Sequence, residues 1–516
     1  MSRKYLSTLF KYVPVKIEGE IPRLLIGGVT ADSRKVQPGW LFVAISGESS
    51  DGLNYAPQAI AKGAAAIVSD RPRPKNLEIP YVHAQGDLRR ALAHLASAFY
   101  DFPARKLRVI GVTGTDGKTT TTSMIHHILT EAGIKAGMIS TVSAQIGTQE
   151  LDTGFHVTTP DSPEIQHYLS LMVKAGMTHC VLETTSHGLA QLRVEACDYD
   201  VAVITNVTHE HIDYHGTWQN YLEAKGRLFE YLRATPHKRI GNPRVAVLNK
   251  DDRSYSYLKH VSPKKQISYS MVNQAALWAD QIENSPQKLR FRLHLHRQVY
   301  QVETHMIGLY NVSNCLAAIA ATVLALGVDV QTALRALQTL PIVPGRMERI
   351  DLGQNFTAIV DFAHTPNALQ RALETVRQLT DKRVIAVYGS AGLRDREKRR
   401  MMPKVSTQFA DVSILTAEDP RTESLAAILE DMASSAIEAG GIEGQTFFRI
   451  GDRREAIRYA VSIAQPGDLI VICGKGHEQS MCFETTEYPW DDRAALRAAL
   501  SEHLNIPGPE MPCLPS

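Results

Sequence analysis

Residues 106–120 of the chain read KLRVIGVTGTDGKTT. The apolar run up to Thr113 has the composition of a buried strand, and the segment GKTTTTSMIHHILTEAG that begins at Gly117 is typical of a helix ending at Gly133. Glycines between a strand and a helix let backbone N–H groups turn toward phosphate oxygens, and the helix N-terminus adds partial positive charge. The stretch therefore predicts a phosphate-binding loop for a nucleoside triphosphate.

The spacing of this loop departs from the standard pattern G-x-x-x-x-G-K-[ST], which needs a glycine where the sequence has Val112. The glycines stand at positions 111, 114 and 117 instead. A chance glycine-rich turn is the alternative, but the strand, the loop, Gly-Lys-Thr and the helix follow one another in order. In such a loop Lys118 reaches the β- and γ-phosphates and Thr119 ligates Mg²⁺.

Length and composition narrow the class of protein. The 516 residues are enough for about three domains, and 44% hydrophobic with 21% charged residues is ordinary globular usage. Lys and Arg number 56 against 54 Asp and Glu, which argues against binding nucleic acid by bulk charge. The six cysteines form no C-x-x-C pair, and the sequence has neither a signal-peptide-like apolar start nor a run of about 18 apolar residues. We expect a cytoplasmic protein with no membrane span and no disulfide scaffold.

Strand-like and helix-like segments alternate along most of the chain, which predicts an α/β fold with mostly parallel sheets. Residues 262–304 differ, because FRLHLHRQVYQVE alternates like a half-exposed antiparallel strand, and NVSNCLAAIAATVLAL after it is strongly helical. The proline-rich stretch TLPIVPGRMERI indicates a boundary, beyond which a second α/β unit begins. The predicted domains are residues 1–104, 105–340 and 341–516.

Polar residues end two further predicted strands of the middle domain. Glu183 follows CVL in ETTSHG, and NVTHEHIDYHG ends the strand DVAVIT. Both should lie at the same sheet edge as the phosphate loop, where a carboxylate near phosphates favours Mg²⁺. His209, His211 and His215 suggest zinc as an alternative, but no further ligands converge in the sequence, and ordinary loop hydrogen bonds are the other interpretation of each histidine.

Nine segments in this order resemble the Mur ligases of peptidoglycan synthesis, and among them the MurE type, which adds a diamino acid to UDP-N-acetylmuramoyl-L-alanyl-D-glutamate. They are GVTGTDGKTTTT, ETTSHGLAQLRV, TNVTHEHIDYHG, YLEAKGRLF, GLYNVSNCLAA, PGRMERI, VDFAHTPNAL, EDPRTE and GKGHE. The resemblance implies an N-terminal UDP-binding domain, a central P-loop ATPase and a C-terminal Rossmann-like domain. It also implies that ATP converts the D-glutamate carboxylate into an acyl phosphate, which the amine of the diamino acid attacks.

The resemblance assigns roles to residues around ATP. Lys118, Glu183, His211 and Lys225 are the implied catalytic residues, and Thr119, Glu183, His211 and Lys225 are the implied Mg²⁺ ligands. Lys225 matches a lysine carbamylated by CO₂ (N6-carboxylysine), whereas without the motif a solvated helix lysine is the default. The implied ATP contacts are Gly114, Thr115, Asp116, Gly117, Lys118, Thr119, Thr120, Asn311, Arg346 and Asp361, with His364 in the motif of Asp361.

The resemblance also implies which residues bind the other two substrates. The UDP-muramoyl-dipeptide would contact Ser33, Arg34, Thr158, Thr159, Thr185, Gln191 and Arg193. The diamino acid would contact Arg394, Glu418, Asp419, Pro420, Arg421, Gly474 and Glu478. Arg421 favours meso-2,6-diaminopimelate, whose distal carboxylate lysine lacks. Glu418-Asp419 stands where Asp-Asn is typical, which keeps L-lysine and L-ornithine open; Asp116, Val157 and Glu210 are further departures from the family pattern.

Two other functions compete with this interpretation. A folylpolyglutamate synthase-like ligase shares the acyl-phosphate logic but lacks the N-terminal UDP-sugar domain, and DSRKVQPGWLFVAI argues against it. A non-catalytic NTP-binding regulator need not keep the whole set of catalytic residues. We expect small-molecule substrates, no nucleic acid and a monomer.

Overall fold

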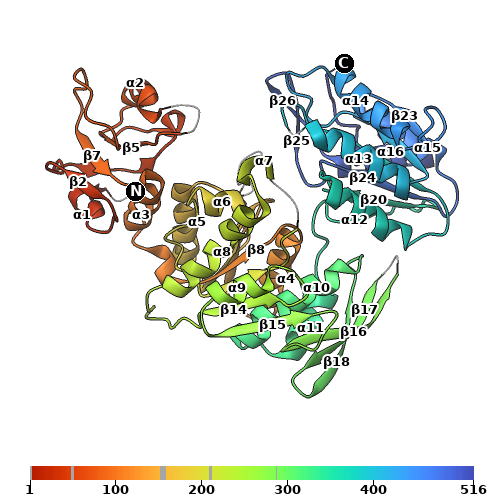
Figure 1. The fold of residues 1–516 in the computed structure, drawn as a ribbon, viewed down its shortest axis with the longest axis horizontal. Helices are drawn as coiled ribbons and strands as arrows, with labels where there is room; N and C mark the ends of the chain where they lie inside the picture. The colour runs from red at the N-terminus through yellow and green to blue at the C-terminus, as the bar shows by residue number, and fades with distance from the viewer. Residues whose placement is uncertain are drawn as a thin grey trace. The chain divides into compact units, whose positions relative to one another are not determined.

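The structure, a computed structural model, describes residues 3–47, 51–151, 159–208, 212–285, 288–394 and 396–515. The chain divides into two units (Figure 1). Of the described residues, the first contains those up to 208 with 215–269 and 317–333, and the second contains 212–214, which begin helix α7 (Ile212–His215), with 270–316 and 334 onward. In the described ranges, no helix is both long enough and apolar enough to cross a membrane.

The N-terminal part of the first unit is a five-stranded sheet in the order β2-β7-β6-β5-β4. Strands β4 to β7 run parallel, and β2 pairs antiparallel with β7 at one edge. The apolar runs LFVAI and AAAIV contribute the central strands β5 and β6. The elements are β1 (Lys4–Tyr5), α1 (Leu6–Phe10), β2 (Lys16–Glu18), β3 (Leu25–Ile26), β4 (Val29–Thr30), β5 (Leu41–Ala44), α2 (Ala56–Ala61), β6 (Ala66–Ser69), β7 (Tyr81–Gln85) and α3 (Leu88–Phe99).

The second sheet of this unit confirms the predicted strand–loop–helix around the phosphate loop. The strand is β8 (Arg108–Thr113) and the helix is α4 (Lys118–Glu131). The sheet order is β11-β10-β9-β12-β8-β13-β14-β15. The strands β9, β12, β8, β13, β14 and β15 run parallel to one another, and β10 and β11 form an antiparallel edge. The other elements are β9 (Ala136–Ile139), β10 (Ala144–Ile146), β11 (Gln149–Leu151), α5 (Ser162–Lys174), β12 (His179–Glu183), α6 (Ser186–Ala190), β13 (Val201–Ile204), α7 (Ile212–His215), α8 (Trp218–Ala234), β14 (Val245–Asn249), α9 (Tyr255–Val261) and β15 (Gln266–Ser270).

Side chains alternate across β8 and place its two faces against different helices. Val109 packs in one core with residues of α5 and α8, among them Leu169 and Leu228. The opposite face, with Ile110 and Val112, is equally buried, and α4 contacts β8 and its neighbour β12. Because the parallel strands are covered in this way, their carboxyl ends carry the loops that can meet a ligand.

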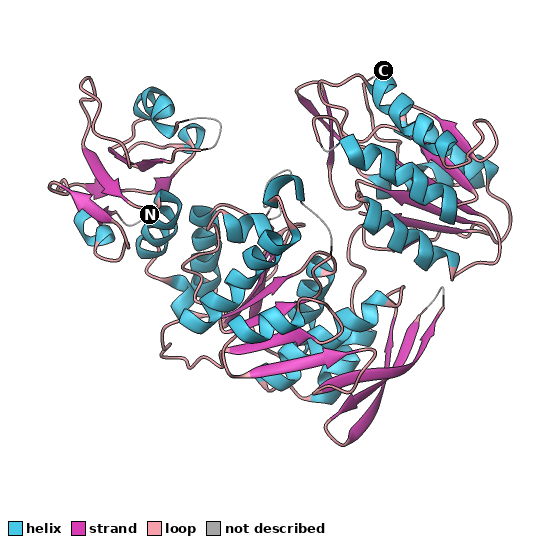
Figure 2. Cartoon of the chain, viewed as in Figure 1, coloured by secondary structure: helices cyan, strands magenta, loops and turns pink. Residues whose placement is uncertain are grey.

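The segment FRLHLHRQVYQVE is antiparallel in the second unit, as its alternation predicts, but it forms two strands of a hairpin rather than one. Strands β17 (Leu289–Leu295) and β18 (Gln298–Thr304) pair antiparallel, and β16 (Leu277–Asn284) pairs with β17 (Figure 2). The turn is only two residues long, His296 and Arg297, with His296 at φ +54°. The predicted helix after it is α10 (Tyr310–Ile319), which continues as a π-helical turn (Ala320–Leu324), followed by α11 (Val330–Gln338).

The C-terminal part of the second unit is a six-stranded sheet in the order β19-β20-β24-β21-β22-β23, parallel except for β19. Helices α12, α13 and α14 contribute to the core on one face, and α15 and α16 to the core on the other, as a doubly wound sheet requires. The elements are β19 (Glu348–Ile350), β20 (Thr357–Asp361), α12 (Pro366–Arg377), β21 (Val384–Tyr388), α13 (Arg396–Phe409), β22 (Val412–Leu415), α14 (Leu425–Glu438), β23 (Phe447–Arg449), α15 (Arg453–Ile463), β24 (Leu469–Cys473), β25 (Ser480–Phe483), β26 (Thr486–Pro489) and α16 (Asp492–Leu504).

Candidate active site

The phosphate loop leaves β8 at Thr113 and turns on two glycines with left-handed backbone. Gly114 has φ +153° and Gly117 has φ +79°. A Cβ at Gly114 would come within 1.8 Å of the Thr205 hydroxyl, so only glycine fits there. The Lys118 ammonium donates to the carbonyl oxygens of Gly114 at 3.1 Å and Thr115 at 2.7 Å. The Lys118 side chain therefore folds back over the phosphate loop, which directly precedes helix α4.

The loop is fixed to the end of the neighbouring strand β13. The Thr205 hydroxyl donates to the Asp116 carbonyl at 2.6 Å, and the Asn206 side-chain oxygen accepts the Asp116 N–H at 3.1 Å. The Thr115 N–H donates to the Asn206 carbonyl at 2.8 Å. The first N–H groups of α4, including those of Thr119 and Thr120, have no carbonyl one turn earlier in the helix to bond. The loop therefore presents a helix N-terminus of fixed position, which suits an anion.

Glu183, at the end of β12, lies against this helix start. Both of its carboxylate oxygens accept the Thr119 hydroxyl at 3.1 Å, and one accepts the Thr141 N–H at 3.1 Å. Both side chains are buried. A hydroxyl and a carboxylate are hard oxygen donors beside a phosphate site, so the residues present fit Mg²⁺. The predicted third ligand, His211, lies outside the described residues.

Lys225, in the middle of α8, points into the loop and is only 1% exposed. Its ammonium donates to the Gly114 carbonyl at 2.6 Å and lies 4.4 Å from the centre of the Tyr221 ring. The Tyr221 hydroxyl is 3.1 Å from that of Thr115. The default interpretation of Lys225 as a solvated helix lysine is therefore wrong.

Three of the residues predicted to grip the muramoyl-dipeptide form one cluster in this unit, with a fourth bonded to it. The hydroxyls of Thr159 and Thr185 are 2.9 Å apart. Arg193 donates to the Thr159 carbonyl at 2.9 Å and to the Gln191 side-chain oxygen at 2.6 Å. Thr158 lies outside the described residues. A guanidinium held in this way has the geometry to receive a carboxylate.

Ser33 and Arg34 lie on a 3-10 turn of the N-terminal sheet. The buried Ser33 hydroxyl donates to the Gln58 side chain at 2.5 Å. Arg34 is exposed and forms an ion pair with Asp32 at 2.9 Å. Arg34 thus keeps a guanidinium at the surface of the predicted UDP-sugar domain.

The predicted ATP residues of the second unit occupy the end of β20 and the start of α10. Asp361 accepts the N–H groups of Met347 at 2.8 Å and Ala363 at 2.9 Å, and so joins the start of β19 to the end of β20. The Arg346 guanidinium lies 4.5 Å from the centre of the Phe362 ring. Asn311 is buried in the first turn of α10, and its side-chain amide donates to the Ile307 carbonyl at 2.7 Å.

The predicted diamino-acid residues come from two loops, 418–421 after β22 and 474–478 after β24. Asp419 accepts the Lys475 ammonium at 2.9 and 3.0 Å, and Lys475 also pairs with Glu478 at 2.6 Å. A Cβ at Gly474 would come within 2.4 Å of a Glu418 carboxylate oxygen. The loops therefore pack against each other through these side chains.

Glu418 is the most unusual group of this cluster. It is 5% exposed, and its Oε2 atom has no hydrogen-bond partner among the described residues. Burial raises the pKa of this carboxyl to about 7, although Lys398, Arg453 and Lys475 act in the opposite direction. A buried carboxylate oxygen without a donor is ready to accept one from a ligand.

The two arginines among the predicted diamino-acid residues differ in exposure. Arg394 is exposed, whereas Arg421 is half-buried, has φ +54° and donates to the Gly392 carbonyl at 3.4 Å. Pro420 packs so closely on Gly392 that a Cβ there would lie 1.9 Å from the Pro420 carbonyl oxygen. This packing fixes the turn from which the Arg421 side chain extends.

Three side chains of these clusters were not singled out in the sequence. Tyr221 bonds the phosphate loop, Lys475 joins the two C-terminal loops, and His477 lies 4.8 Å from the Phe362 ring. Burial lowers the pKa of His477 to about 3, and nearby Arg346 contributes. Lys475 and His477 lie within GKGHE, so that motif was the available signal, whereas Tyr221 is an ordinary apolar-face residue of its helix in sequence.

Comparison with known proteins places the whole chain in one family. Three family models match it: "Mur ligase family, catalytic domain" over residues 25–100, "Mur ligase middle domain" over 112–322, and "Mur ligase, glutamate ligase domain" over 345–476. The UDP-N-acetylmuramoyl-L-alanyl-D-glutamate--2,6-diaminopimelate ligase of Geobacillus thermodenitrificans is 44% identical over 91% of this chain and 94% of its own length. The UDP-N-acetylmuramyl-tripeptide synthetase of Roseiflexus sp. is 42% identical over 92% and 95%.

A solved structure gives the same result in three dimensions. That structure is of a UDP-N-acetylmuramoyl-L-alanyl-D-glutamate--2,6-diaminopimelate ligase and superposes with a TM-score of 0.65 at 31% identity, covering 96% of this chain and 99% of that one. With relatives above 30% identity aligned over nearly their entire length, the fold and the order of the motifs have one explanation. The chain belongs to the Mur ligase family.

Proposed function

We propose that this chain is an ATP-dependent ligase of peptidoglycan synthesis, which joins meso-2,6-diaminopimelate to UDP-N-acetylmuramoyl-L-alanyl-D-glutamate. The observation that carries the proposal is the Thr119–Glu183 contact beside the phosphate loop, in a chain 44% identical to a relative named for that reaction. The reaction needs no membrane anchor, and we propose a cytoplasmic monomer.

The proposed reaction has two steps. The γ-carboxylate of D-glutamate attacks the γ-phosphorus of ATP, ADP leaves, and an acyl phosphate forms. The amine of the diamino acid then attacks the acyl carbon, inorganic phosphate leaves, and the amine loses its proton. Phosphoryl transfer onto an anion needs positive charge around the phosphates, which Lys118 and the N-terminus of α4 supply.

Thr119 and Glu183 are the described residues that would hold Mg²⁺, with His211 as the third proposed ligand. When bound, the ion neutralises phosphate charge and fixes the phosphate oxygens. The hydrogen bond between Thr119 and Glu183 keeps both oxygen donors at the helix start and holds the hydroxyl in a single orientation.

We propose that Lys225 carries a carbamate formed with CO₂. The Gly114 carbonyl accepts hydrogen bonds from both Lys118 and Lys225, so two ammonium groups lie close to one oxygen and repel each other. When the Lys225 ammonium loses one proton, its nitrogen bonds CO₂ and then releases a second proton, so that an anion replaces one of the two cations. The repulsion becomes an attraction, and the carbamate adds an oxygen ligand beside the metal site.

The remaining assignments are also proposals, and the geometry supports them to different degrees. Arg346, Asp361 and Asn311 would bind ATP, while Ser33, Arg34, Thr158, Thr159, Thr185, Gln191 and Arg193 would bind the UDP-precursor. Arg394, Glu418, Asp419, Pro420, Arg421, Gly474 and Glu478 would bind the diamino acid. Each family model matches within one of the proposed domains 1–104, 105–340 and 341–516, which supports those bounds.

An assay with a panel of amino acids tests the proposal. Purified protein receives ATP, Mg²⁺ and the UDP-muramoyl-dipeptide with diaminopimelate, L-lysine or L-ornithine, and mass spectrometry detects the amide product. We expect product with diaminopimelate. Product with lysine or ornithine alone would move the proposal to that amino acid, and no product with any of the three would overturn it.

A further inference from the structure

Arg453, the first residue of α15, forms a fully buried ion pair with Asp492, the first residue of α16. Both side chains are 0% exposed. The guanidinium donates to the two carboxylate oxygens at 2.8 and 2.7 Å, and the Trp490 indole N–H donates to the same carboxylate at 2.8 Å. The arginine is therefore held in one orientation by a bidentate contact whose partner is itself fixed.

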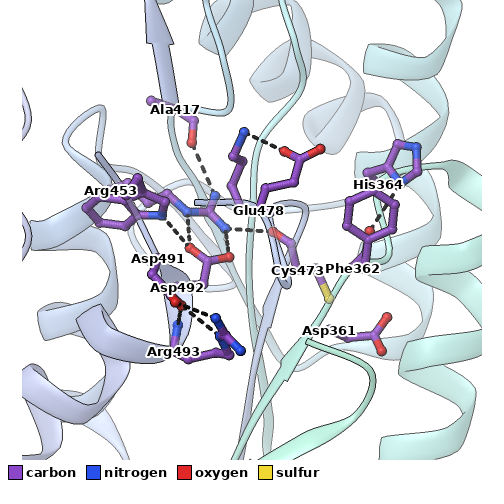
Figure 3. Close-up of polar contacts among 12 residues, drawn as sticks. Asp361, Phe362, His364, Ala417, Arg453, Cys473, Glu478, Asp491, Asp492 and Arg493 are labelled. Atoms are coloured by element: carbon purple, nitrogen blue, oxygen red, sulfur yellow. Dashed lines mark hydrogen bonds and ion pairs between the residues drawn. The ribbon is translucent and has the colours of Figure 1, made fainter. Parts of the chain in front are cut away.

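The rest of this guanidinium bonds two backbone carbonyls at the carboxyl edge of the sheet (Figure 3). It donates to the Ala417 oxygen at 3.2 Å and to the Cys473 oxygen at 2.8 Å. Ala417 directly precedes Glu418, and Cys473 directly precedes Gly474. One side chain thus bonds the first turn of both loops to which the diamino-acid residues belong.

The strand order explains why such a bridge is needed. The two loops follow β22 and β24, and β21 lies between these strands in the sheet. No ladder of hydrogen bonds therefore joins β22 directly to β24, yet Glu418 and Gly474 lie in contact. The Arg453 guanidinium spans that gap beneath them, and its charge faces the buried Glu418 carboxyl.

We propose that Arg453, oriented by Asp492 and Trp490, is a positioning residue for the amino-acid substrate. It sets the spacing between Glu418 and Gly474 and so fixes the Glu418 oxygen for which the described part of the chain supplies no donor. An ammonium group of the amino acid binds there. This inference rests on the proposed function, because that function makes the two loops a substrate site. The guanidinium itself does not touch the substrate.

A second arginine–aspartate pair of the same domain, in which Asp468 is buried and Arg383 is partly exposed, offers a control. Arg383 donates to Asp468 at 3.1 and 2.6 Å and to the Ile463 carbonyl at 2.8 Å. These residues directly precede β21 and β24, so the pair lies at the amino edge of the sheet, away from both loops. Loss of this pair affects the fold but not the spacing of Glu418 and Gly474.

The test compares Arg453→Lys with Arg383→Lys. Lysine keeps the charge but cannot bond Asp492 and both carbonyls at once. We expect Arg453→Lys to raise KM for the amino acid at least about tenfold, with KM for ATP and for the UDP-precursor changed less than about twofold, because a misplaced binding group acts on its own substrate. We expect Arg383→Lys to leave all three KM values unchanged within about twofold.

Trapping the first step separates this inference from the proposed function. Borohydride reduces an acyl phosphate to an alcohol, which mass spectrometry detects without any amino acid present. We expect the same yield of alcohol from wild type and from Arg453→Lys. If wild type makes neither alcohol nor amide, the proposed function fails; if it makes both and Arg453→Lys has an unchanged KM for the amino acid, only the positioning role fails.

Trp490→Phe keeps the test decisive if Arg453→Lys does not fold. This variant keeps an aromatic ring and removes one hydrogen bond to Asp492. We expect a smaller rise in KM for the amino acid alone. A folded variant in which all three KM values rise together, or in which none changes, would overturn the positioning role.

Discussion

The Lys225 ammonium donates a hydrogen bond of 2.6 Å to the carbonyl oxygen of Gly114, across 111 residues of sequence. Gly114 is the residue at which the chain leaves β8 for the phosphate loop, and Lys118 donates to the same oxygen. The buried lysine thus bonds the first residue of the proposed phosphate loop. We expect its removal to act on catalysis more than on helix α8.

Lys225→Ala should lower kcat at least about a hundredfold, which is typical for the loss of one preorganised electrostatic group. Acetate or propionate should restore part of the activity, because a short carboxylate can occupy the space of the proposed carbamate. The measurement is phosphate release with and without the added acid, together with the ¹³C NMR signal of a carbamate after incubation with labelled bicarbonate. A fully active alanine variant would remove this lysine from the site.

Lys118→Ala should lower phosphate release at least about a thousandfold, because the positive charge nearest the β- and γ-phosphates is lost. Lys259→Ala is the matched control, since Lys259 is exposed on α9 of the same unit. Thermal unfolding of both variants shows whether the fold is intact. Turnover that survives in a folded Lys118→Ala protein would show that the loop binds no triphosphate.

The loop and its strand could be predicted from the sequence because the signals are local. β8, the glycines of the loop and α4 lie within 24 residues, from Arg108 to Glu131, and each has its own composition. The hairpin β17–β18 was missed because its two-residue turn, His296-Arg297, contains none of the Gly, Asn or Asp residues that usually mark such turns. The π-helical turn after α10 was also missed, because the composition of this segment is ordinary for an α-helix. In the structure the Thr322 hydroxyl donates to the Ala318 carbonyl.

The pairing of Arg453 with Asp492 could not be predicted from the sequence. The chain reads Asp-Arg-Arg at 452–454 and Trp-Asp-Asp-Arg at 490–493, so each segment offers two adjacent candidates. Arg453 and Asp492 turn inward and pair, while Arg454 pairs locally with Asp452. Only the tertiary packing of α15 against α16 distinguishes the buried arginine from the surface one.

Arg421→Ala should raise KM for diaminopimelate at least about a hundredfold while changing that for lysine much less, because only diaminopimelate has a distal carboxylate to lose its charged partner. Competition between the two amino acids at equal concentration, read by mass spectrometry, measures the change in preference. Arg400→Ala is the control, because Arg400 is an exposed arginine of the nearby helix α13. Equal losses with both amino acids would mean that Arg421 does not contact the distal carboxylate.

Glu418→Gln should make the protein more stable than wild type at pH 8 and about equally stable at pH 5. Burial raises the pKa of Glu418 from 4.5 to about 7, so the folded protein holds this proton more tightly than the unfolded chain. The stability from this group is complete below pH 4.5 and is lost as the pH rises through about 7, with an upper bound of about 3 kcal/mol at about 1.4 kcal/mol per pKa unit.

Thermal unfolding of both proteins between pH 5 and pH 8 checks this difference. Glu443→Gln, at an exposed glutamate of the same domain, is the control and should run parallel to wild type. The Glu418 variant should also bind the amino acid more weakly, because an amide carries no charge for an ammonium group. Parallel curves for wild type and Glu418→Gln would mean that this carboxyl is already ionised at pH 5.

Lys238→Met should destabilise the first unit by about 3–5 kcal/mol without lowering kcat of the folded protein. Lys238 and Asp200 form an ion pair at 2.5 Å with both side chains 0% exposed, and the same carboxylate accepts the Val109 N–H at 2.7 Å. Removing the lysine leaves an uncompensated buried charge. The pair lies at the amino ends of β8 and β13, and the phosphate loop lies at the carboxyl end, so the sheet separates the two effects. The unfolding temperature and kcat at 20 °C measure the two effects separately. Asp200→Asn in the Lys238→Met background should recover part of the lost stability. A fall in kcat as large as that of Lys118→Ala would show that the pair acts on the loop.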